Sequence, residues 1–201
     1  MIRFIIIISL YLSDTVAIAG GDPVRGKNKT IICIGCHGVD GNNTNSIYPI
    51  LAGQSEVYLT KQLNDFKTGK RQEEHMSSMV EAITKADIPD ISSYFAMQKR
   101  KPLNISKKDT PHGKQIYFKG GNSRFVSACV TCHKNIGPTN NNTPYPTLSG
   151  QHSDYIQKTL KEFRSRKRHN DLNKTMRNIA IKLSDKEIKD VADYIATMNM
   201  K

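Results

Sequence analysis

Cysteine, acidic residues and long apolar runs are all scarce in this sequence. Its 201 residues include 4 cysteines, and 18 Asp and Glu stand against 30 Lys and Arg. Beyond residue 19, no apolar stretch approaches the roughly 20 residues that a membrane-spanning helix needs. We therefore expect no spanning segment in the rest of the chain. With 37% apolar residues, the sequence is also lean for building two packed cores.

The apolar run at the start of the chain predicts a secretory signal peptide over residues 1–19. Arg3 supplies a positive charge, Phe4–Leu12 is apolar, and a small-x-small pattern ends at Ala19. The alternative is a membrane anchor, but Asp14 interrupts the run too early for a spanning helix. We therefore expect the protein to be exported, with cleavage near Ala19.

All the cysteines lie in two copies of one motif, Cys-x-x-Cys-His. The copies are formed by Cys33, Cys36 and His37 and by Cys129, Cys132 and His133. This spacing is the attachment signature of a c-type haem. Two thiols three positions apart on a helical turn can each add to a haem vinyl group, and the histidine that follows can bind the iron. The sequence therefore predicts two covalently attached haem c groups.

Three other interpretations of a Cys-x-x-Cys pair compete with haem: a redox disulfide, half of a zinc site, and chance. A thioredoxin-like pair needs a preceding strand and a βαβ context, and neither is visible. Two such pairs can together make an all-thiolate zinc site, but here they lie almost a hundred residues apart. Neither alternative requires a histidine after both pairs, so covalent haem is the favoured interpretation.

The chain repeats itself, which indicates a duplicated domain. Tyr-Pro-x-Leu-x-Gly-Gln occurs at 48–54 and again at 145–151, and the offset between the copies drifts only from 87 to 100. Other repeated positions pair Tyr58, Phe66, Arg71 and Met76 with Tyr155, Phe163, Arg168 and Met176. We expect domains over 20–101 and 111–201, joined by a linker over 102–110. Two haems would add apolar surface to these two small cores.

Each copy is predicted to be all-α, with three helices. The first two helices of each copy are expected over 23–36, 55–68, 110–118 and 152–166. The last helix is expected to begin at a capping box, formed by Thr84 and Asp87 in the first copy and by Ser184 and Glu187 in the second. Segments rich in Asn and Gly after each haem motif, over 41–46 and 135–143, are expected to be loops.

Methionine is the expected sixth ligand of each iron, because it closes the coordination and raises the reduction potential. Met176 has no competitor in its segment, whereas Met76 and Met79 both precede the last helix of the first copy. The repeat places Met76 opposite Met176, and Met79 opposite Ile179, an apolar packing residue. We therefore predict Met76 as the ligand, with Met79 as the second choice. Met97 is expected to pack in the core.

The remaining histidines are weaker candidates. His75 adjoins Met76, but its counterpart in the repeat is Thr175. His112, His152 and His169 have no matching histidine in the first copy and are expected at the surface. A metal-bound histidine usually donates its other ring N–H to a backbone carbonyl or carboxylate. We expect such a carbonyl for each haem-motif histidine in the Tyr-Pro-x-Leu segment that follows it.

With these motifs, and a Met before each final helix, the sequence resembles the cytochrome c4 family. The resemblance covers essentially all of the expected mature chain and extends to Met176–Ser184. It implies two tandem class I cytochrome c domains, related by a pseudo-twofold axis and each wrapped around one haem. It further implies a periplasmic electron carrier, soluble or loosely attached to the membrane, between a quinol-oxidising complex and a terminal oxidase. The implied iron ligands are His37 with Met76, and His133 with Met176.

A second function from another class stays open. The haem subunit of an enzyme such as a flavin-containing sulfide dehydrogenase has a similar double-cytochrome design. An exposed apolar patch too large for a free monomer would favour that role. A stand-alone di-haem peroxidase is disfavoured, because both sixth positions are expected to be filled.

Positive charge gathers in the second half of the chain. Residues 20–104 carry 11 basic and 9 acidic residues, and residues 105–201 carry 18 and 8. Such an excess can indicate nucleic acid, an anionic surface or an acidic protein partner, and expected export with two haem motifs argues against nucleic acid. The densest cluster comprises Arg164, Arg166, Lys167 and Arg168. We expect an acidic redox partner to dock mainly on the second domain, unless these side chains only solvate it.

Overall fold

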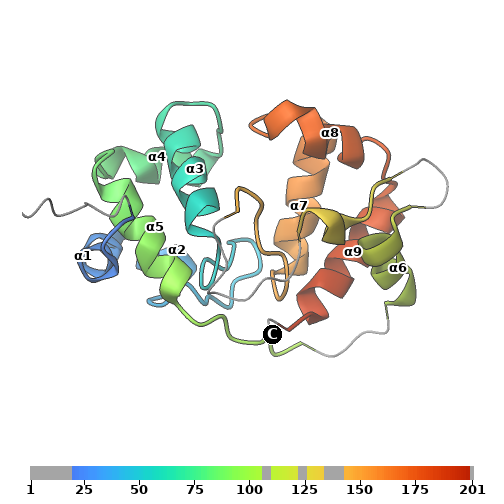
Figure 1. Ribbon diagram of the computed structural model, residues 1–201, viewed down its shortest axis with the longest axis horizontal. Helices are drawn as coiled ribbons and strands as arrows, with labels where there is room; N and C mark the ends of the chain where they lie inside the picture. Colours follow the sequence, from blue (N-terminus) through green and yellow to red (C-terminus); the bar gives the residue numbers. More distant parts are fainter. Residues whose placement is uncertain (1–19, 106–109, 122–125, 134–142, 200–201) are drawn as a thin grey trace, which may run out of the picture.

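The computed structural model describes residues 20–105, 110–121, 126–133 and 143–199, and they form two helical halves that lie side by side (Figure 1). Within these ranges the only β-structure is an isolated antiparallel bridge between Gly121 and Val126. None of the described helices is long and apolar enough to cross a membrane. The expected signal peptide lies outside the described residues, as does nearly all of the loop expected over 135–143.

Within the described ranges, the first half holds five α-helices and two short 3-10 turns. They are α1 (Pro23–Lys29), η1 (Ile31–Cys33), α2 (Ile34–His37), α3 (Glu56–Lys67), α4 (Glu74–Met79), η2 (Val80–Ala82) and α5 (Asp87–Met97). Asp22 caps α1 by accepting from the backbone N–H groups of Val24 and Arg25, and Pro23 occupies the first helical position. The expected middle helix over 55–68 is confirmed as α3.

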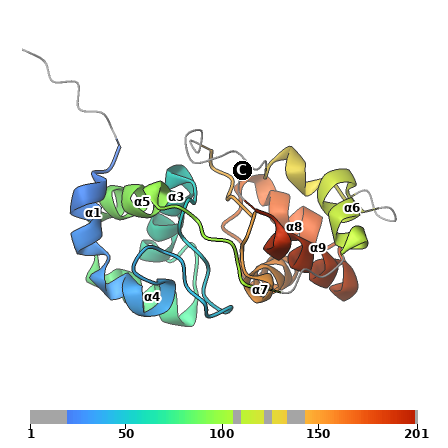
Figure 2. The same ribbon diagram turned by 90° about the horizontal axis from the view of Figure 1, so that it is seen from below.

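The second half repeats this order. Its described elements are α6 (Pro111–Lys119), η3 (Cys129–Thr131), α7 (Ser153–Arg164), η5 (Leu172–Lys174), α8 (Thr175–Ala180) and α9 (Asp185–Thr197). The helices expected over 110–118 and 152–166 are confirmed as α6 and α7. The expected capping box of Ser184 and Glu187 is present at the start of α9. Figure 2 shows the same two halves from below, again side by side.

The prediction of one continuous helix over 23–36 is wrong. The helix α1 ends at Lys29, and η1 and α2 follow as separate turns. Thr30 begins a run of three β-branched residues, which lose side-chain freedom in an α-helix. Its hydroxyl also donates to the carbonyl of Lys27 at 2.8 Å, which competes with the helical backbone bond.

Two further expectations about the first half need correction. Thr84 does not cap α5, because the N–H of Asp87 donates to the Thr84 carbonyl at 3.1 Å instead of to the Thr84 hydroxyl. Only the reverse half of the box forms, in which the Asp87 carboxylate accepts from the backbone and hydroxyl of Thr84. Met97 is not a core residue but is 68% exposed. The buried stripe of α5 runs through Ile88, Ile91 and Phe95, and Met97 lies off it.

The three-helix prediction also misses α4 and α8, the short helices that carry Met76 and Met176. Each has only six residues, which is too few to produce a recognisable apolar period. Along the chain, each comes between the middle and last helices of its half, and in Figure 1 both lie in the upper part of the molecule, near α3 and α7. Met76 and Met176 pack against the cores of their own halves.

In each half, the first and last helices cross at a glycine. A Cβ on Gly26 would lie 2.0 Å from the carbonyl oxygen of Asp90, and one on Gly113 would lie 2.0 Å from that of Asp190. The backbones of α1 and α5, and of α6 and α9, therefore approach at a distance that only glycine allows. This contact explains why glycine stands at both positions of the repeat.

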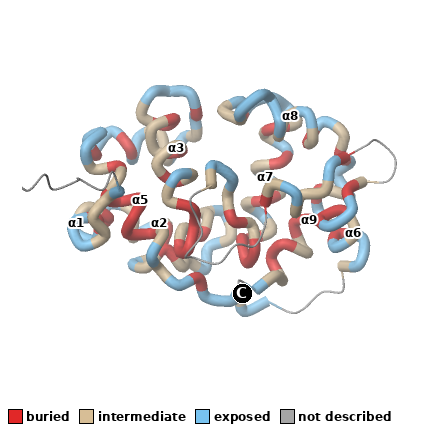
Figure 3. The backbone as a smooth tube through the Cα atoms, viewed as in Figure 1, coloured by how far each residue is buried: buried red, intermediate tan, exposed pale blue. Residues whose placement is uncertain are grey.

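Each half has its own apolar core (Figure 3). The first comprises Leu59, Phe66, Val80, Ile83, Ile88, Ile91, Tyr94 and Phe95. The second comprises Ile116, Tyr117, Val126, Ile156, Leu160, Leu183, Ile188, Val191, Ala192 and Ile195. Met76 packs against the first core and Met176 against the second, and both are partly buried. Two separate cores are what two domains of this size require.

The two domains are joined by reciprocal hydrogen bonds from their repeated glutamines. Gln54 donates to the carbonyl of Thr147 at 3.0 Å and accepts from the N–H of the same residue at 2.6 Å. Gln151 makes the same pair of bonds with Ile50, at 3.0 and 2.8 Å. Since Ile50 and Thr147 occupy equivalent positions in the repeat, the interface follows a pseudo-twofold axis.

Arg100, in the segment that follows α5, bonds to both domains at the interface. Its guanidinium donates to the carbonyl of Ala52 in the first domain and to that of Ser149 in the second, at 2.8 Å each. Burial of this side chain lowers its pKa to about 10, still far above neutral pH. Arg100 therefore stays charged while buried, and carbonyl oxygens of both domains stabilise it.

Candidate haem sites

The histidine of each Cys-x-x-Cys-His motif is buried and held by one ring nitrogen. Nδ1 of His37 lies 2.9 Å from the carbonyl oxygen of Pro49, and Nδ1 of His133 lies 3.0 Å from that of Pro146. Both prolines belong to the Tyr-Pro-x-Leu segments, so the expected location of these carbonyls is confirmed. Burial lowers the pKa of both rings, although the bond to the proline carbonyl opposes this. The neutral ring that results, anchored through Nδ1, is a form suited to binding a metal through Nε2.

The cysteines beside these histidines form no disulfide bonds with one another and are partly buried. Burial, and then the neighbouring thiol, raises the pKa of Cys33 to about 11. Burial likewise raises the pKa of Cys129 to about 11. Within the described residues, no group of three or more His, Cys, Asp or Glu side chains could hold a metal ion. The two cysteine pairs are therefore not gathered into one group of ligands.

One cavity of about 750 Å³ runs through both domains and contains all the expected site residues in its lining. These are Cys33, Cys36, His37, Met76, Cys129, Cys132, His133 and Met176. Core residues such as Phe66, Phe95 and Leu160 supply apolar walls. Each domain thus presents two thiols, a histidine and a methionine to one apolar space, which is the donor set that a covalent haem requires.

The alternatives for the sixth ligand of the first domain differ in exposure. Met76 packs against the first core, whereas Met79 is 38% exposed, although both line the cavity. The side chain of His75 is 64% exposed. In the second domain, Met176 and Ile179 both pack against the core. Met76 and Met176 therefore occupy matching positions, each beside the core of its own domain.

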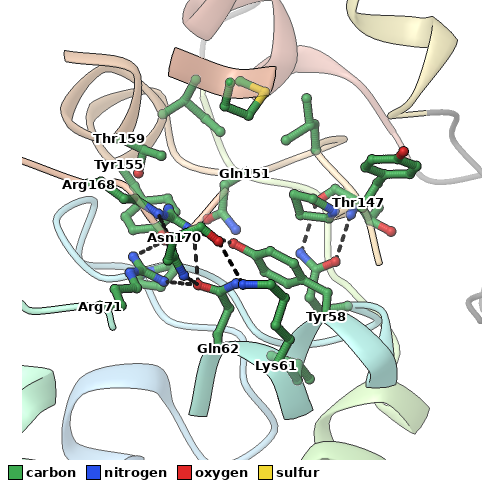
Figure 4. A pocket seen from close by; sticks show the side chains of 18 of the residues that line it. Tyr58, Lys61, Gln62, Arg71, Thr147, Gln151, Tyr155, Thr159, Arg168 and Asn170 are labelled. Atoms are coloured by element: carbon green, nitrogen blue, oxygen red, sulfur yellow. Dashed lines mark hydrogen bonds between the residues drawn. The ribbon is translucent and has the colours of Figure 1, made fainter. Parts of the chain in front are cut away.

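Buried polar residues between the domains form a part of the site that sequence reasoning missed (Figure 4). Arg71 donates to Tyr155 of the second domain at 3.3 Å, and Arg168 donates to Tyr58 of the first at 3.1 Å. Both guanidinium groups also donate to Oε1 of Gln62, at 2.8 and 3.0 Å. The repeat pairs Arg71 with Arg168 and Tyr58 with Tyr155, and this shared pattern was the signal that could have revealed the contact.

The sequence predicts that Arg168 belongs to a basic cluster for docking a partner. In the structure it is buried between the domains and does not belong to an exposed cluster. It is 6% exposed, and its guanidinium lies over the ring of Phe163, 4.6 Å from the ring centroid. Arg71 stacks in the same way on Phe66, at 4.5 Å. The aromatic face and the hydroxyl acceptors offset the cost of burying each charge.

These two arginines bear on what the cavity can bind. Among the described residues, no ion pair involves either Arg71 or Arg168, although both line the cavity and both are buried. Their charges lower the pKa of Tyr155 to about 8, even though burial alone would raise it. Two buried cations without a carboxylate partner fit a ligand that carries its own acidic groups. Haem has two propionates, so the residues present fit this cofactor.

His152 also differs from the expectation of a surface residue. It is buried, and its Nε2 lies 3.2 Å from the carbonyl oxygen of Asn43 in the other domain. Burial lowers the pKa of this ring. The position directly follows Gln151, so the interface that this glutamine makes covers its neighbour. His112 and His169 are exposed, as expected.

Comparison with known proteins agrees with this geometry. The family model described as Cytochrome c matches twice, over residues 28–99 and 112–199. A cytochrome c4 from Pseudomonas aeruginosa is 38% identical over 88% of this chain and 89% of its own. The crystal structure of reduced cytochrome c4 from Pseudomonas stutzeri aligns with a TM-score of 0.83 and 35% identity, covering 90% of this chain and all of that one.

A further relative has a more specific name. The thiosulfate dehydrogenase electron acceptor of Thiomonas intermedia is 31% identical over 82% of this chain and 77% of its own length. The identity with the cytochromes c4 is higher and extends over more of both chains. The chain therefore belongs to the cytochrome c4 family, the di-haem c-type electron carriers built from two cytochrome c domains.

Proposed function

We propose that this protein is a periplasmic electron carrier whose irons are held by His37 with Met76 and by His133 with Met176. In this proposal, Cys33 and Cys36 bind the first haem covalently, and Cys129 and Cys132 bind the second. The observation that carries the proposal is the repeated pairing, in one cavity, of an anchored buried histidine with a methionine from a short helix. We place the domains at 20–101 and 111–201, with a linker at 102–110.

The bound haem supplies one-electron chemistry, and the residues of the chain make that exchange fast and selective. The proline carbonyls fix the orientation of each histidine ring. Met76 and Met176 would each complete the coordination of a bound iron and leave no open site for an external ligand. The apolar walls exclude water from the site. Nearby fixed charges and dipoles would therefore set the reduction potential of a bound haem. Arg71 and Arg168 are placed to hold acidic groups of the cofactor between the domains.

We further propose that electrons pass from a quinol-oxidising complex to a terminal oxidase, with an acidic partner docking mainly on the second domain. Of the basic cluster expected from the sequence, Arg166 and Lys167 are exposed, and Arg164 pairs with Asp185 at 2.5 Å. Two charges of the cluster therefore point freely to solvent, where they can steer an acidic partner toward the protein.

A second candidate is an electron-accepting subunit of an oxidoreductase, such as flavocytochrome c sulfide dehydrogenase. The similarity to the electron acceptor of a thiosulfate dehydrogenase supports a role of this class. The first domain also exposes Ile32, Ile47 and Met79 along the cavity rim. Apolar side chains around a redox centre suit a lasting protein contact.

A direct experiment separates these roles. The protein is purified from periplasm and weighed by mass spectrometry, and the oxidised form is then mixed with quinol and a quinol-oxidising complex. The carrier role predicts a chain starting near Gly20 with two added haems, rapid reduction by the complex, and reoxidation by membranes that contain a terminal oxidase. A mass with one haem or none would contradict the proposal. Reduction only by a co-purifying dehydrogenase would select the second candidate.

A further inference from the structure

The helix that carries Met76 is capped by a residue that the other domain also holds. Glu73 precedes α4, and its Oε2 accepts from the backbone N–H groups of His75 and Met76 at 3.1 Å each. Its other oxygen, Oε1, accepts from Nζ of Lys158 at 2.9 Å. Lys158 lies on α7, in the second domain. One carboxylate therefore connects the backbone of Met76 with the opposite domain.

The charges around this carboxylate favour the connection. The ammonium of Lys158 and the two N–H groups at the start of α4 hold the pKa of Glu73 near 2, although burial alone would raise it. A negative charge at a helix N-terminus also interacts favourably with the helix dipole. The imidazole of the exposed His75 lies 3.9 Å from the same oxygen as Lys158. Glu73 is thus ionised. One of its oxygens accepts from the α4 backbone and the other accepts from Lys158.

The corresponding helix of the second domain is held from within. Asp171 precedes α8, and its carboxylate accepts from the backbone N–H of Arg177 at 3.0 Å and from Nε of the same residue at 2.7 Å. Its side chain is 4% exposed. No ion pair from the first domain reaches this carboxylate among the described residues. The bonds that this carboxylate makes to the first turn of the Met176 helix therefore lie within a single domain.

Lys61, the repeat counterpart of Lys158, shows the same difference. It lies on α3, pairs with Asp65 of its own helix, and donates to the backbone carbonyl of Asn170 across the interface at 2.8 Å. Both lysines thus cross between the domains. Only Lys158 contacts a charged group that is bonded to the first turn of a methionine-bearing helix. Lys61 instead contacts a backbone atom at the end of the loop that follows α7.

We propose that Lys158 is a positioning residue for the first iron site, through which the second domain stabilises the bond between Met76 and iron. The inference rests on the proposed assignment of Met76 as the sixth ligand. Loss of the ammonium would leave Glu73 without its cross-domain partner and loosen the first turn of α4. The methionine of the first site would then leave the iron more readily. The second site would keep its methionine, because the carboxylate that bonds the first turn of α8 pairs with Arg177 of its own domain.

Imidazole binding to the oxidised two-haem protein tests this proposal, because imidazole competes with methionine for the sixth position. The near-infrared methionine-to-iron absorption reports both sites as imidazole is added. Lys158→Met should raise the apparent imidazole affinity of one iron about threefold to tenfold, in line with loss of a hydrogen bond between charged groups. Lys158→Arg should restore the parent value. Lys61→Met, the matched control, should leave the affinity of both irons within twofold of the parent.

Glu73→Gln supplies a second variant, because an amide oxygen can still accept from the α4 backbone but does not attract the ammonium. Its effect should resemble that of Lys158→Met, and the double variant should add nothing further. Additive effects, equal shifts at both irons, or an equal effect of Lys61→Met would overturn the proposal. Far-ultraviolet circular dichroism of each holoprotein checks that the helices are intact.

Met76→Ala keeps the failure of this inference distinct from the failure of the proposed ligand set. If Met76→Ala retains the whole near-infrared absorption, the ligand assignment fails and the inference fails with it. If that variant loses half of the absorption while Lys158→Met leaves imidazole binding unchanged, the ligand stands. In that case only the role of Lys158 is refuted.

Discussion

The crossing of the first and last helices is built differently in the two domains. In the first, Asp90 on α5 pairs with Arg25 and Lys29 of α1, at 3.0 and 2.8 Å. In the second, Asp190 on α9 pairs with His112 of α6 and Lys186 of its own helix. Both domains have a glycine on the first helix and an aspartate on the last helix at this crossing. The cationic partners of the aspartate differ between the domains. A duplicated fold thus keeps the close approach of its backbones while the charges around it change.

The boundary between the domains shows the opposite behaviour. The paired bonds of Gln54 and Gln151, and those of Arg71 and Arg168, have matching partners on each side. Buried polar groups are costly without partners, so both sides of this region must be satisfied together. The glutamine bonds and the arginine–tyrosine bonds at this boundary therefore keep the symmetry of the repeat, whereas the ion pairs at the two helix crossings do not.

The largest effect is expected where the interface departs from symmetry, at Arg100. The repeat counterpart of Arg100 is Met200, whose side chain has no hydrogen-bond donor. Arg100→Met would leave the Ala52 and Ser149 carbonyls without their donor, at a cost of roughly 3 kcal/mol in the free energy of unfolding. For a chain of this size, the midpoint of thermal unfolding should fall by about 10 °C. Calorimetry of the holoprotein measures it.

The neighbouring Lys99 provides the control for this change. It is exposed, and Lys99→Met should alter the unfolding midpoint by less than about 2 °C. If Arg100→Met proves as mild as Lys99→Met, the buried arginine does not hold the domains together. A separation of one calorimetric transition into two would show that it couples their unfolding.

Acid should weaken the first helix crossing through Asp87 and Asp90. Bonds from Lys29 and Thr84 lower the pKa of Asp87 to about 2, and Arg25 and Lys29 hold that of Asp90 well below its usual range. Because these folded pKa values lie below the unfolded ones, the stability they confer is complete above about pH 4. It is lost as the pH falls toward 2.

Lys29→Met removes the cation that pairs with both Asp87 and Asp90 at the first crossing. This change should return the pKa of Asp87 toward its ordinary value and move the acid-unfolding midpoint of the first domain to higher pH. Lys27→Met, an exposed change on the same helix, should leave the midpoint in place. The two are followed by circular dichroism between pH 5 and 1. An unchanged midpoint in Lys29→Met would show that this ion pair does not govern acid stability.

A smaller effect is expected at the ends of the middle helices. Gly69 after α3 has φ of 73°, and its repeat counterpart Arg166 after α7 has φ of 64°. The left-handed conformation suits glycine but is strained for arginine. Arg166→Gly should therefore stabilise the protein by about 1 kcal/mol, raising the unfolding midpoint by roughly 2–4 °C.

The reverse substitution tests whether strain is the cause. No heavy atom lies within 4 Å of a Cβ built on Gly69. Gly69→Arg should therefore cost a similar free energy through its backbone alone, without a clash. If both variants unfold at the temperature of the parent, the left-handed arginine carries no measurable strain.

The smallest effect concerns docking, because a single surface charge changes an encounter rate only severalfold. Lys167→Glu should slow electron transfer with an acidic partner by a factor of a few at low salt, and the difference should shrink as salt screens the charges. Lys70→Glu changes the matching position of the first domain. The proposal of docking on the second domain would be contradicted if stopped-flow rates fell equally in the two variants. Rates that do not change with salt concentration would also contradict it.

Sequence reasoning succeeded where local chemistry sets the structure. The haem motifs, the middle helices and the carbonyls that anchor both histidines follow from patterns within a few tens of residues. The sequence did not predict the break of the first helix after Lys29, the exposure of Met97, or the contacts between the two domains. Arg168 and His152 are polar and sit in polar surroundings along the chain, so nothing local distinguishes them from surface residues. They are buried because a surface of the other domain covers them. Such a contact depends on residues about a hundred positions away.

The central claim is that each iron is bound by the histidine of its motif and by Met76 or Met176, respectively. It is tested most directly by the near-infrared methionine-to-iron absorption of the oxidised two-haem protein. We predict that Met76→Ala and Met176→Ala each abolish half of this absorption, that the double variant abolishes all of it, and that Met79→Ala leaves it intact. Full absorption in Met76→Ala, with half lost in Met79→Ala, would contradict the account.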